Sequence, residues 1–377
     1  MNMQRPRGTR DLSGLELSSI RKVMRTMDIL FRRYGFEEVE TPIFEHLELF
    51  TKKSGSNVVN QLYVFKDKSG RELALRPELT APVVRLYIEK FRSSPKPVKL
   101  FYFGSCFRYE EPQARRWRQF LQAGVEIMGS SNPSADAEVA ALSSELMREL
   151  GLVNSELRIG QIRLLRELLA HAGVKGDAQD AILRAIDSKE EGRIKDELKT
   201  AGVGAKDEKL LRELIALRGG IGVIDRAGEL LKGISTAVAA LKNLREIIKH
   251  LNLLGVNFSI DLGIARGLDY YTDFVFEIYV GGVQVAGGGR YDNLVEQLEG
   301  EPTPAVGVGF GVDRIAQAML DLKLVAPKDR LDCLVLPADE KSRDEAVRIV
   351  AELRVAGLST DMDHMGRSLT KAMAFAN

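Results

Sequence analysis

The chain has 377 residues, which is longer than one ordinary domain and predicts two or three domains. Its 45% hydrophobic and 28% charged residues are typical of a folded protein and exclude a disordered or collagen-like chain. The 54 basic residues nearly balance the 53 acidic ones, so a nucleic-acid partner would have to be bound by local basic patches.

The cysteine and histidine content argues against disulfides and structural metals. The two cysteines, Cys106 and Cys333, are far apart in the sequence, which suits a reducing cytoplasm. The four histidines have no metal-ligand spacing, so we expect no zinc site. No apolar run is long enough to span a bilayer, and the polar start MNMQRPRGTRDL resembles neither a signal peptide nor an anchor. We therefore expect a cytoplasmic protein without membrane contact.

The first predicted elements are a helix and a broken strand. Apolar residues at helical spacing run from Ile20 to Tyr34, and Gly35 ends the run. The next segment, FEEVETPIFEH, reads as a strand interrupted at Pro42. A proline of this kind belongs at a sheet edge or an interface.

Two hairpins and a helix follow. The segment QLYVFKDKSGRELALRPE predicts a hairpin that turns at residues 68–70. A second hairpin runs from Val98 to Met128 across the charged loop EPQARRWR, and a helix from Ser134 to Leu150 ends at Gly151.

The composition changes twice in the second half of the chain. Residues 154–255 are rich in Lys, Glu, Leu and Ala, which predicts a helical insertion; glycine-rich strands resume over 258–312, and a helix begins near Asp313. From Asp332 the pattern is β–α–β–α. A parallel α/β unit is not finished with two strands, so we expect the chain to stop inside a domain at Asn377.

The most informative segment carries polar residues within glycine-rich strands. It reads RGLDYYTDFVFEIYVGGVQVAGGGRYDNL and is followed by AVGVGFGVDRI. Arginines fixed on a rigid sheet suit phosphate groups, and glycines let a flat ligand approach the backbone. The residues that attract attention are Arg266, Asp269, Tyr270, Tyr271, Arg290 and Arg314.

Known nucleotide-binding loops do not explain this segment. The run GGGRYD at 287–292 is typical of a bulge or tight turn and does not follow the dinucleotide-binding fingerprint; no P-loop is present. Tyr270 and Tyr271 usually indicate core packing, but adjacent residues on a strand point to opposite faces, so one of them can face a ligand. We expect any nucleotide to be bound by a sheet surface and arginines.

Other polar pairs are spaced to share one face of a strand. Residues two apart on a strand point the same way. These pairs are Glu78 with Thr80, Arg108 with Glu110, and Gln122 with Glu126. Each pair alone reads best as ordinary surface ion pairing, but the whole set together predicts a concave site. The arginines around Trp117 have two equally good interpretations. They could form a solvated charged turn, or they could contact the phosphates or bases of a nucleic acid or nucleotide.

Several segments resemble, in order, the signatures of class II aminoacyl-tRNA synthetases, and specifically of histidyl-tRNA synthetases. YGFEEVETPIFEH resembles motif 1, and LRPELTAPVVR resembles the segment that binds the amino group of the amino acid. FRYEEPQARRWRQFLQAGVEIMG resembles motif 2, and GVGFGVDRI resembles motif 3. RGLDYYTDFVFE and GGGRYDNL resemble the two histidine-specific signatures. The resemblance extends from about Arg5 to Leu320.

The resemblance implies an α+β fold with a class II synthetase antiparallel β-sheet catalytic core and flanking helices. It places the core at residues 1–153 and 256–328, and a helical insertion domain at 154–255 that lies against the tRNA acceptor arm. Residues 329–377 resemble the start of a C-terminal α/β anticodon-binding domain. The family also implies a homodimer with Pro42 at its interface. Because only part of the anticodon-binding domain is present, adenylate formation should survive while tRNA binding is in question.

The resemblance implies a histidine pocket and an ATP site. It assigns these residues to histidine: Glu78, Thr80, Gln122, Glu126, Tyr270, Tyr271 and Tyr291. Glu126 and Tyr271 would hydrogen-bond the imidazole, while Glu78 and Thr80 would hold the α-amino group. In the ATP site, the catalytic Arg108 and Arg266 would flank the α-phosphate, Arg116 and Arg314 would bind the β- and γ-phosphates, and Glu110 would contact the adenine.

The implied reaction is histidine–tRNA ligation. Histidine and ATP, with Mg²⁺ on the phosphates, would give histidyl-adenylate and pyrophosphate, and the histidyl group would pass to the 3′ end of tRNA(His). We expect no DNA partner. Leu121 departs from the family, which often has histidine there. One alternative is the catalytically inactive, synthetase-like regulatory subunit of ATP phosphoribosyltransferase; another is a tRNA-sensing module of the kind fused to a kinase, although no kinase motif is present.

Overall fold

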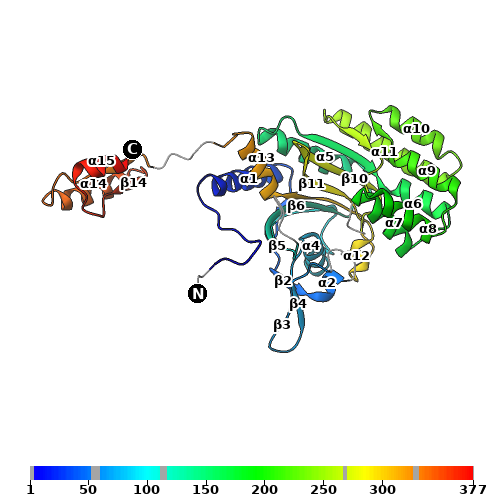
Figure 1. Ribbon diagram of the computed structural model, residues 1–377, viewed down its shortest axis with the longest axis horizontal. Helices are drawn as coiled ribbons and strands as arrows, with labels where there is room; N and C mark the ends of the chain where they lie inside the picture. Colours follow the sequence, from blue (N-terminus) through cyan, green and yellow to red (C-terminus); the bar gives the residue numbers. More distant parts are fainter. Residues whose placement is uncertain (1–3, 52–59, 111–116, 266–269, 326–330, 377) are drawn as a thin grey trace. The chain divides into compact units, whose positions relative to one another are not determined.

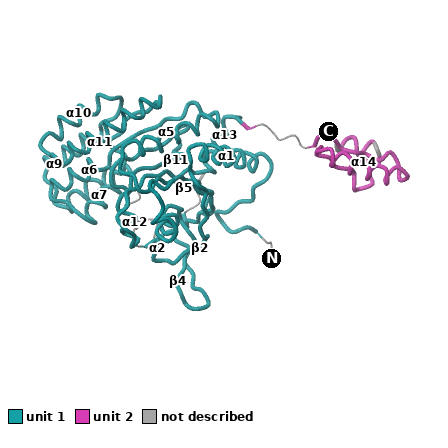
Figure 2. Tube along the Cα trace, turned by 180° about the vertical axis from the view of Figure 1, so that it is seen from behind, with its two compact units in different colours: residues 1–324 teal, residues 325–377 magenta. Residues whose placement is uncertain are grey.

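The computed structural model describes residues 4–51, 60–110, 117–265, 270–325 and 331–376. The chain divides into two compact units, Met1–Leu324 and Val325–Asn377, which are coloured separately in Figure 2. Within the described part, the helices are all too short or too polar to cross a membrane.

The first unit is built on one large sheet (Figure 1). Among the described residues this sheet has nine strands in the order β1-β5-β6-β12-β11-β10-β7-β9-β8. In chain order they are β1 (Glu37–Glu38), β5 (Val98–Phe107), β6 (Gln119–Met128), β7 (Glu156–Gln161), β8 (Arg218–Gly219), β9 (Ser259–Asp261), β10 (Phe274–Val280), β11 (Val283–Arg290) and β12 (Ala305–Gly311). From β5 to β7 in this order, every neighbouring pair is antiparallel. The predicted antiparallel core and the hairpin of residues 98–128 are confirmed.

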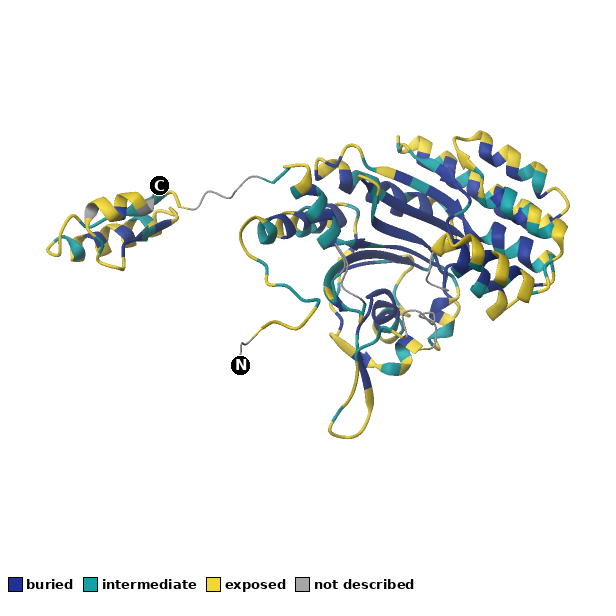
Figure 3. Cartoon of the chain, viewed as in Figure 1, coloured by how far each residue is buried: buried dark blue, intermediate teal, exposed yellow. Residues whose placement is uncertain are grey.

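One face of the sheet is covered by helices α1 (Gly14–Arg33), α5 (Pro133–Glu149) and α13 (Val312–Asp321). The buried side of α1 includes Val23, Met27 and Leu30, whose spacing fits the helical repeat, and the chain turns at Gly35 with φ of +77°. Figure 3 shows this buried stripe facing the sheet. The predicted helix and its end are therefore confirmed.

The opposite face carries α4 (Thr80–Leu86), its π-helical continuation η1 (Tyr87–Phe91) and α12 (Leu294–Gln297). Beside them, within the described residues, lies a three-stranded sheet of β2 (Phe44–His46), β4 (Glu72–Leu75) and β3 (Val64–Lys66), with α2 (Leu47–Thr51) after β2. β1 and β2 flank Pro42, as the interrupted strand predicts. In the predicted turn, the Asp67 carboxylate accepts hydrogen bonds from the backbone N–H groups of Ser69 and Arg71.

The insertion is less purely helical than its composition predicts. Its helices are α6 (Ile162–His171), α7 (Asp177–Ser188), α8 (Glu191–Thr200), α9 (Ala205–Ile215), α10 (Gly222–Leu230) and α11 (Ser235–Leu253). However, β7 pairs with β10 inside the main sheet, and α11 packs on α5. The expectation of helix throughout 154–255 is wrong at β7 because Leu157 and Ile159 alternate with polar residues and are buried.

The second unit has the predicted β–α–β–α order. It contains β13 (Cys333–Val335), α14 (Arg343–Val355), β14 (Thr360–Met362) and α15 (Leu369–Ala376). β13 and β14 are parallel, with Cys333 opposite Thr360. Helix α14 therefore forms the crossover that a parallel pair requires.

Candidate functional site

Glycines from neighbouring strands share the face of the sheet that α1 and α5 leave open. The register sets Gly307 between Glu126 and Gly289, and Gly309 between Gly124 and Gly287. Alternate residues of β12 point the other way, and the Phe310 ring packs 5.8 Å from Phe31 of α1. We call the open surface the glycine floor; it comprises Gly104, Gly124, Gly287, Gly289, Gly307, Gly309 and Gly311. Because glycine has no side chain, groups can lie directly on the backbone there.

Glu126 lies over this floor, and its carboxylate is buried. A Cβ atom added at Gly307 would overlap the carboxylate, so only glycine leaves room for it. The Tyr102 hydroxyl donates to Oε1 at 2.8 Å, and the Tyr291 hydroxyl donates to Oε2. Burial raises the pKa of Glu126 to about 7, although both tyrosine hydrogen bonds oppose the shift.

Glu78 and Thr80 are close together for a different reason from the one predicted. They do not share a strand face: Thr80 begins α4, and the Glu78 carboxylate accepts hydrogen bonds from the backbone N–H groups of Thr80 and Ala81. This is an N-terminal helix cap. The Thr80 hydroxyl lies 3.5 Å from that of Tyr102, which brings the cap beside Glu126.

The two buried acids make this end of the site suitable for a cation. Burial raises the pKa of Glu78 above its usual range, even though the capping N–H groups and Arg108 lower it. The charge of Glu78 also contributes to the raised pKa of Glu126. A positively charged ligand between the two carboxyl groups would relieve both the desolvation and the repulsion.

Tyr270 and Tyr271 close the same end, but not as a strand pair. Strand β10 starts at Phe274, and both tyrosines are buried before it, with ring centroids 4.8 Å apart. The Tyr270 ring also packs edge-on against Tyr291 at 5.6 Å, and Tyr271 lies over Gly289. The prediction that they point to opposite faces of a strand is therefore wrong, because the chain turns here.

The other end of the floor carries arginines. Arg108 stacks over the Phe120 ring at 5.3 Å, and its Nε donates to the Pro77 carbonyl at 2.9 Å. Arg314 lies over Gly311 and donates to the Gln284 carbonyl at 3.0 Å. Glu126 follows Phe120 by six positions in β6, a span of about 20 Å along the strand. The floor thus joins an acidic pocket to a basic end.

Gln122 lies along this path, and Glu110 follows Arg108 at the basic end. The Gln122 side chain lies over Gly309, as expected for a residue that shares its strand face with Glu126, and its Oε1 accepts from the Cys106 thiol at 3.3 Å. The backbone N–H of Glu110 donates to the Arg108 carbonyl at 2.8 Å. Leu121 points to the helix-covered face by strand alternation, so the floor does not include its side chain.

Some predicted residues are placed elsewhere or not described. Arg116, Arg266 and Asp269 lie outside the described residues. Arg290 is not available to a ligand: it is 3% exposed, on the helix-covered face, and its guanidinium binds Asp136 of α5 through two hydrogen bonds of 2.9 and 2.7 Å. The run GGGRYD makes no tight turn, because residues 287–290 pair with strands on both sides.

Two residues of the site were missed in the sequence. Tyr102 shares its strand face with Gly104, and this alternation could have placed it at the floor. Arg76 is 3% exposed and donates to the carbonyl oxygens of Ser105 at 2.8 Å and Thr41 at 2.7 Å. It fixes the segment before Glu78 against β5, and no local pattern in the sequence indicates that role.

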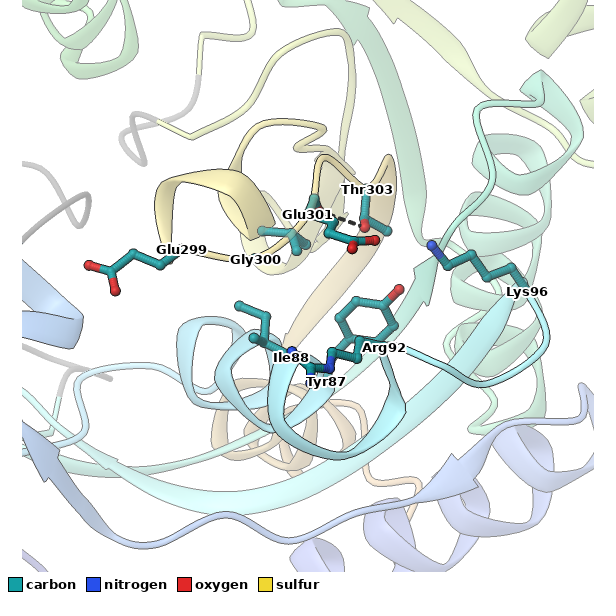
Figure 4. Close-up of a pocket in the computed structure, with 9 residues that line it drawn as sticks. Tyr87, Ile88, Arg92, Lys96, Glu299, Gly300, Glu301 and Thr303 are labelled. Atoms are coloured by element: carbon teal, nitrogen blue, oxygen red, sulfur yellow. Dashed lines mark hydrogen bonds between the residues drawn. The ribbon is translucent and has the colours of Figure 1, made fainter.

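A separate small cavity lies at the far end of α4 (Figure 4). It has a volume of about 80 Å³ and is lined by residues of η1, the loop before β5 and the segment before β12. The Tyr87 hydroxyl, which is buried, has no hydrogen-bond partner among the described residues. None of the predicted site residues lines this cavity, so the glycine floor remains the candidate site.

Comparisons with known proteins point to one family. The family model described as histidyl-tRNA synthetase matches residues 8–315. The histidine–tRNA ligase of Methanocaldococcus jannaschii is 42% identical over 99% of this chain and 89% of its own length. That of Pyrococcus abyssi is 40% identical over all of this chain and 89% of its own length.

Solved structures agree with this result. An ATP phosphoribosyltransferase regulatory subunit/histidyl-tRNA synthetase from Bacillus halodurans matches with a TM-score of 0.84 and 26% identity, covering 100% of this chain and 97% of its own. The apo histidyl-tRNA synthetase of S. aureus matches with a TM-score of 0.71 and 28% identity, covering 99% of this chain and 87% of its own.

Proposed function

Because this chain belongs to the histidyl-tRNA synthetase family and is a histidine–tRNA ligase, we propose that the glycine floor is the surface on which it activates histidine with ATP. The observation that carries the proposal is the order of charges along the floor. The buried carboxyl group of Glu126 lies at one end and the guanidinium groups of Arg108 and Arg314 at the other, with the buried carboxyl group of Glu78 between them. Histidine is cationic at its amino group, and ATP is anionic, so the two substrates match the two ends.

Histidine binds at the acidic end. Glu78 and Thr80 hold the α-amino group, with Gln122 nearby, and Glu126 and Tyr271 hydrogen-bond the imidazole. Tyr270 and Tyr291 form the pocket wall. Glu126 is suited to this role because Tyr102 and Tyr291 fix its orientation while its carboxylate keeps further lone pairs for an imidazole N–H. An amino acid without an imidazole would leave this buried group unpaired, which can give a discrimination on the order of 10⁴.

ATP binds with its phosphates at the basic end. Arg108 contacts the α-phosphate, Arg266 lies on its other side, Arg116 and Arg314 bind the β- and γ-phosphates, and Glu110 contacts the adenine. The histidine carboxylate attacks the α-phosphorus in line and displaces pyrophosphate. Negative charge grows on the α-phosphate oxygens, and a guanidinium fixed by the Pro77 carbonyl and Phe120 stabilises it without reorganisation.

Mg²⁺ fits this site as a companion of ATP. No three His, Cys, Asp or Glu side chains converge as a metal site in the part of the chain that the structure describes. Mg²⁺ commonly keeps several waters and binds substrate phosphates, so phosphate and water oxygens would supply most of its ligands here. When bound, it neutralises charge on the β- and γ-phosphates.

The remaining domains serve the tRNA. We assign residues 1–153 and 256–328 to the catalytic core, 154–255 to an insertion domain against the acceptor arm of tRNA(His), and 329–377 to part of the anticodon-binding domain. The compactness of Val325–Asn377 as its own unit supports the last assignment. The pairing of β7 with β10 connects the beginning of this insertion to the core sheet.

We also propose a homodimer that works in the cytoplasm. Next to Pro42, Ile43 is 50% exposed and Phe44 is 52% exposed. Phe44 packs edge-on against Phe65, itself 40% exposed, with centroids 6.0 Å apart. This solvent-exposed aromatic pair on the three-stranded sheet supports a dimer interface at this position, because contiguous apolar surface is otherwise rarely exposed.

Histidine-dependent ATP–pyrophosphate exchange tests the site. Arg108→Ala should lower the exchange rate about 100-fold or more, because it removes a donor to the reacting phosphate. Arg226→Ala is the matched control: it removes a 59% exposed arginine that pairs with Glu229 of α10 and should leave the rate unchanged. Equal rates for both variants would refute the assignment. Absence of exchange in the folded wild-type protein would instead favour the inactive regulatory subunit.

A further inference from the structure

The segment before α1 is attached to the end of the β5–β6 hairpin. The Gly8 carbonyl accepts a hydrogen bond of 2.8 Å from the Arg118 backbone N–H. Gly8 has φ of +82°, and a Cβ atom there would come within 2.7 Å of the Arg118 side chain. Glycine is therefore required for both conformation and space. We call residues 5–11 the N-terminal arm.

Arg118, which binds the N-terminal arm, also pairs with Arg108 across the hairpin. The backbone N–H of Arg108 donates to the Arg118 carbonyl at 2.9 Å, so the two residues form one rung of the hairpin end. The Arg118 guanidinium stacks over Tyr109 at 3.9 Å and donates to the Glu110 carbonyl at 3.1 Å. The N-terminal arm thus holds the strand end that carries the proposed α-phosphate ligand.

Arg10 joins this hairpin to the start of α13. Its guanidinium forms hydrogen-bonded ion pairs with Asp313 and Glu16, and it stacks over the Trp117 ring at 4.9 Å. Only 11% of the Arg10 side chain is exposed. Asp313 also accepts the Leu121 backbone N–H and immediately precedes Arg314. Arg10 therefore contacts both segments that carry proposed ATP-binding arginines.

We propose that Arg10 is a positioning residue of the ATP site, which fixes the hairpin end at Trp117 against the start of α13 through Asp313. This inference rests on the proposed assignment of Arg108 and Arg314 to ATP. Without the guanidinium, the Asp313 carboxylate, whose side chain is only 11% exposed, loses its cation, and Trp117 loses its stacking partner. The two arginines would then no longer be held at a fixed separation. In the part of the chain that the structure describes, no arm residue forms a hydrogen bond or ion pair with Glu126 or Glu78, so histidine binding should be unaffected.

The chain contains a built-in reporter for this contact, because Trp117 is its single tryptophan. The experiment compares the tryptophan emission of wild type, Arg10→Gln, Arg10→Lys and Arg5→Gln during ATP titration, together with the KM values for ATP and histidine. Arg5 is the matched control, an arm arginine with 56% side-chain exposure whose only ion pair among the described residues is with exposed Asp11 at 3.9 Å. Thermal unfolding checks that each variant is folded.

We expect Arg10→Gln to change the Trp117 emission maximum and to raise the KM for ATP about tenfold, the effect of one lost charge-assisted contact. The KM for histidine should change by less than about twofold. Arg10→Lys should be intermediate, because lysine keeps the charge for Asp313 but loses the planar stacking group. Arg5→Gln should match wild type in every readout.

Two results would overturn the inference. One is an Arg10→Gln variant with wild-type emission and a wild-type KM for ATP. The other is an equal rise of both KM values with a lowered unfolding temperature, which would indicate general destabilisation. Failure of the proposed function is distinguishable: wild type would then show no histidine-dependent exchange, while the difference in Trp117 emission between wild type and Arg10→Gln without ATP would still report on the contact of Arg10 with Trp117.

Discussion

At the scale of single residues, Glu126 shows how function and stability oppose each other. Its carboxyl is buried, and its pKa is raised from 4.5 to about 7, so the folded protein holds a proton there that the unfolded chain has released. The free energy of unfolding therefore falls as pH rises from about 4.5 to about 7. Above pH 7 the whole loss of stability that the ionised Glu126 carboxylate causes is present. In the proposed function, the carboxyl group serves as the acceptor for the imidazole of histidine.

Glu126→Gln should stabilise the protein and inactivate it. Glutamine does not titrate, so the gain in unfolding free energy should be on the order of 1–3 kcal/mol at pH 8 and smaller at pH 5. Urea unfolding at the two pH values measures it. Histidine-dependent exchange should fall at least about 100-fold. A gain that is equal at both pH values, or a loss of stability at pH 8, would contradict this account of the carboxyl.

Residues that depend on strand alternation could be predicted from sequence, whereas residues that depend on a turn could not. Gln122 and Glu126 lie over the floor because both are in β6 on one face. Glu78 was paired with Thr80 correctly, but through a helix cap and not through a strand. Arg290 looked like a ligand residue, and only the packing of α5 shows that Asp136 binds it. Its role depends on a partner 154 residues away in sequence.

At the scale of elements, the two faces of β12 have different roles, because successive residues of the strand point to opposite faces. Gly307 and Gly309 face the floor, while Val306 and Val308 face the helices and are buried. The sequence AVGVGFGVDRI already contains this pattern, so the element and its two faces could be predicted. The sequence of β12 does not show which side chains cover its glycines, because those side chains come from β6 and α13.

Gly307→Ala and Val308→Ala should have opposite effects. A methyl group at Gly307 collides with the Glu126 carboxylate and must displace it, so exchange should fall about 100-fold or more while the unfolding temperature changes little. Val308→Ala removes core volume and should cost about 1–3 kcal/mol of stability with exchange retained. Exchange assays and urea unfolding of both variants measure this. Wild-type exchange in Gly307→Ala would contradict the role of the floor.

The ion pair between α5 and β11 should be a major stabilising contact. Asp136→Asn leaves the buried Arg290 guanidinium without its main counter-charge, and we expect a loss of about 3–5 kcal/mol. Asp28→Asn is the control: it breaks an exposed pair with Arg32 and should cost under about 1 kcal/mol. Urea unfolding compares them. Similar losses for the two variants would show that the buried pair does not fix α5 on the sheet.

At the scale of the whole molecule, the order of elements was predictable, and the assembly of the sheet was not. Hairpins and helices follow the local patterns, as does the β–α–β–α order of the second unit. The composition of residues 154–255 predicts a helical insertion but does not reveal β7, because the pairing of β7 with β10 joins residues more than a hundred positions apart. Nonlocal pairing of this kind leaves only a short alternating signal in the sequence.

The exposed aromatic pair at Phe44 and Phe65 makes a prediction about assembly. Phe65→Asp should convert a dimer into a monomer, because a charge would be buried without a partner at the proposed interface. Ile221→Asp, at a residue 55% exposed before α10, should leave the dimer intact. Sedimentation velocity at micromolar concentration measures both. A monomeric wild type, or dimers in both variants, would contradict an interface at this sheet.

The central claim is that histidine and ATP lie side by side on the glycine floor. A crystal structure of the chain with histidine and a non-hydrolysable ATP analogue tests it most directly. We expect the imidazole within hydrogen-bond distance of Glu126, the amino group at Glu78, and the α-phosphate at Arg108. Histidine bound away from Glu126, or phosphates that make no contact with Arg108, would contradict the account.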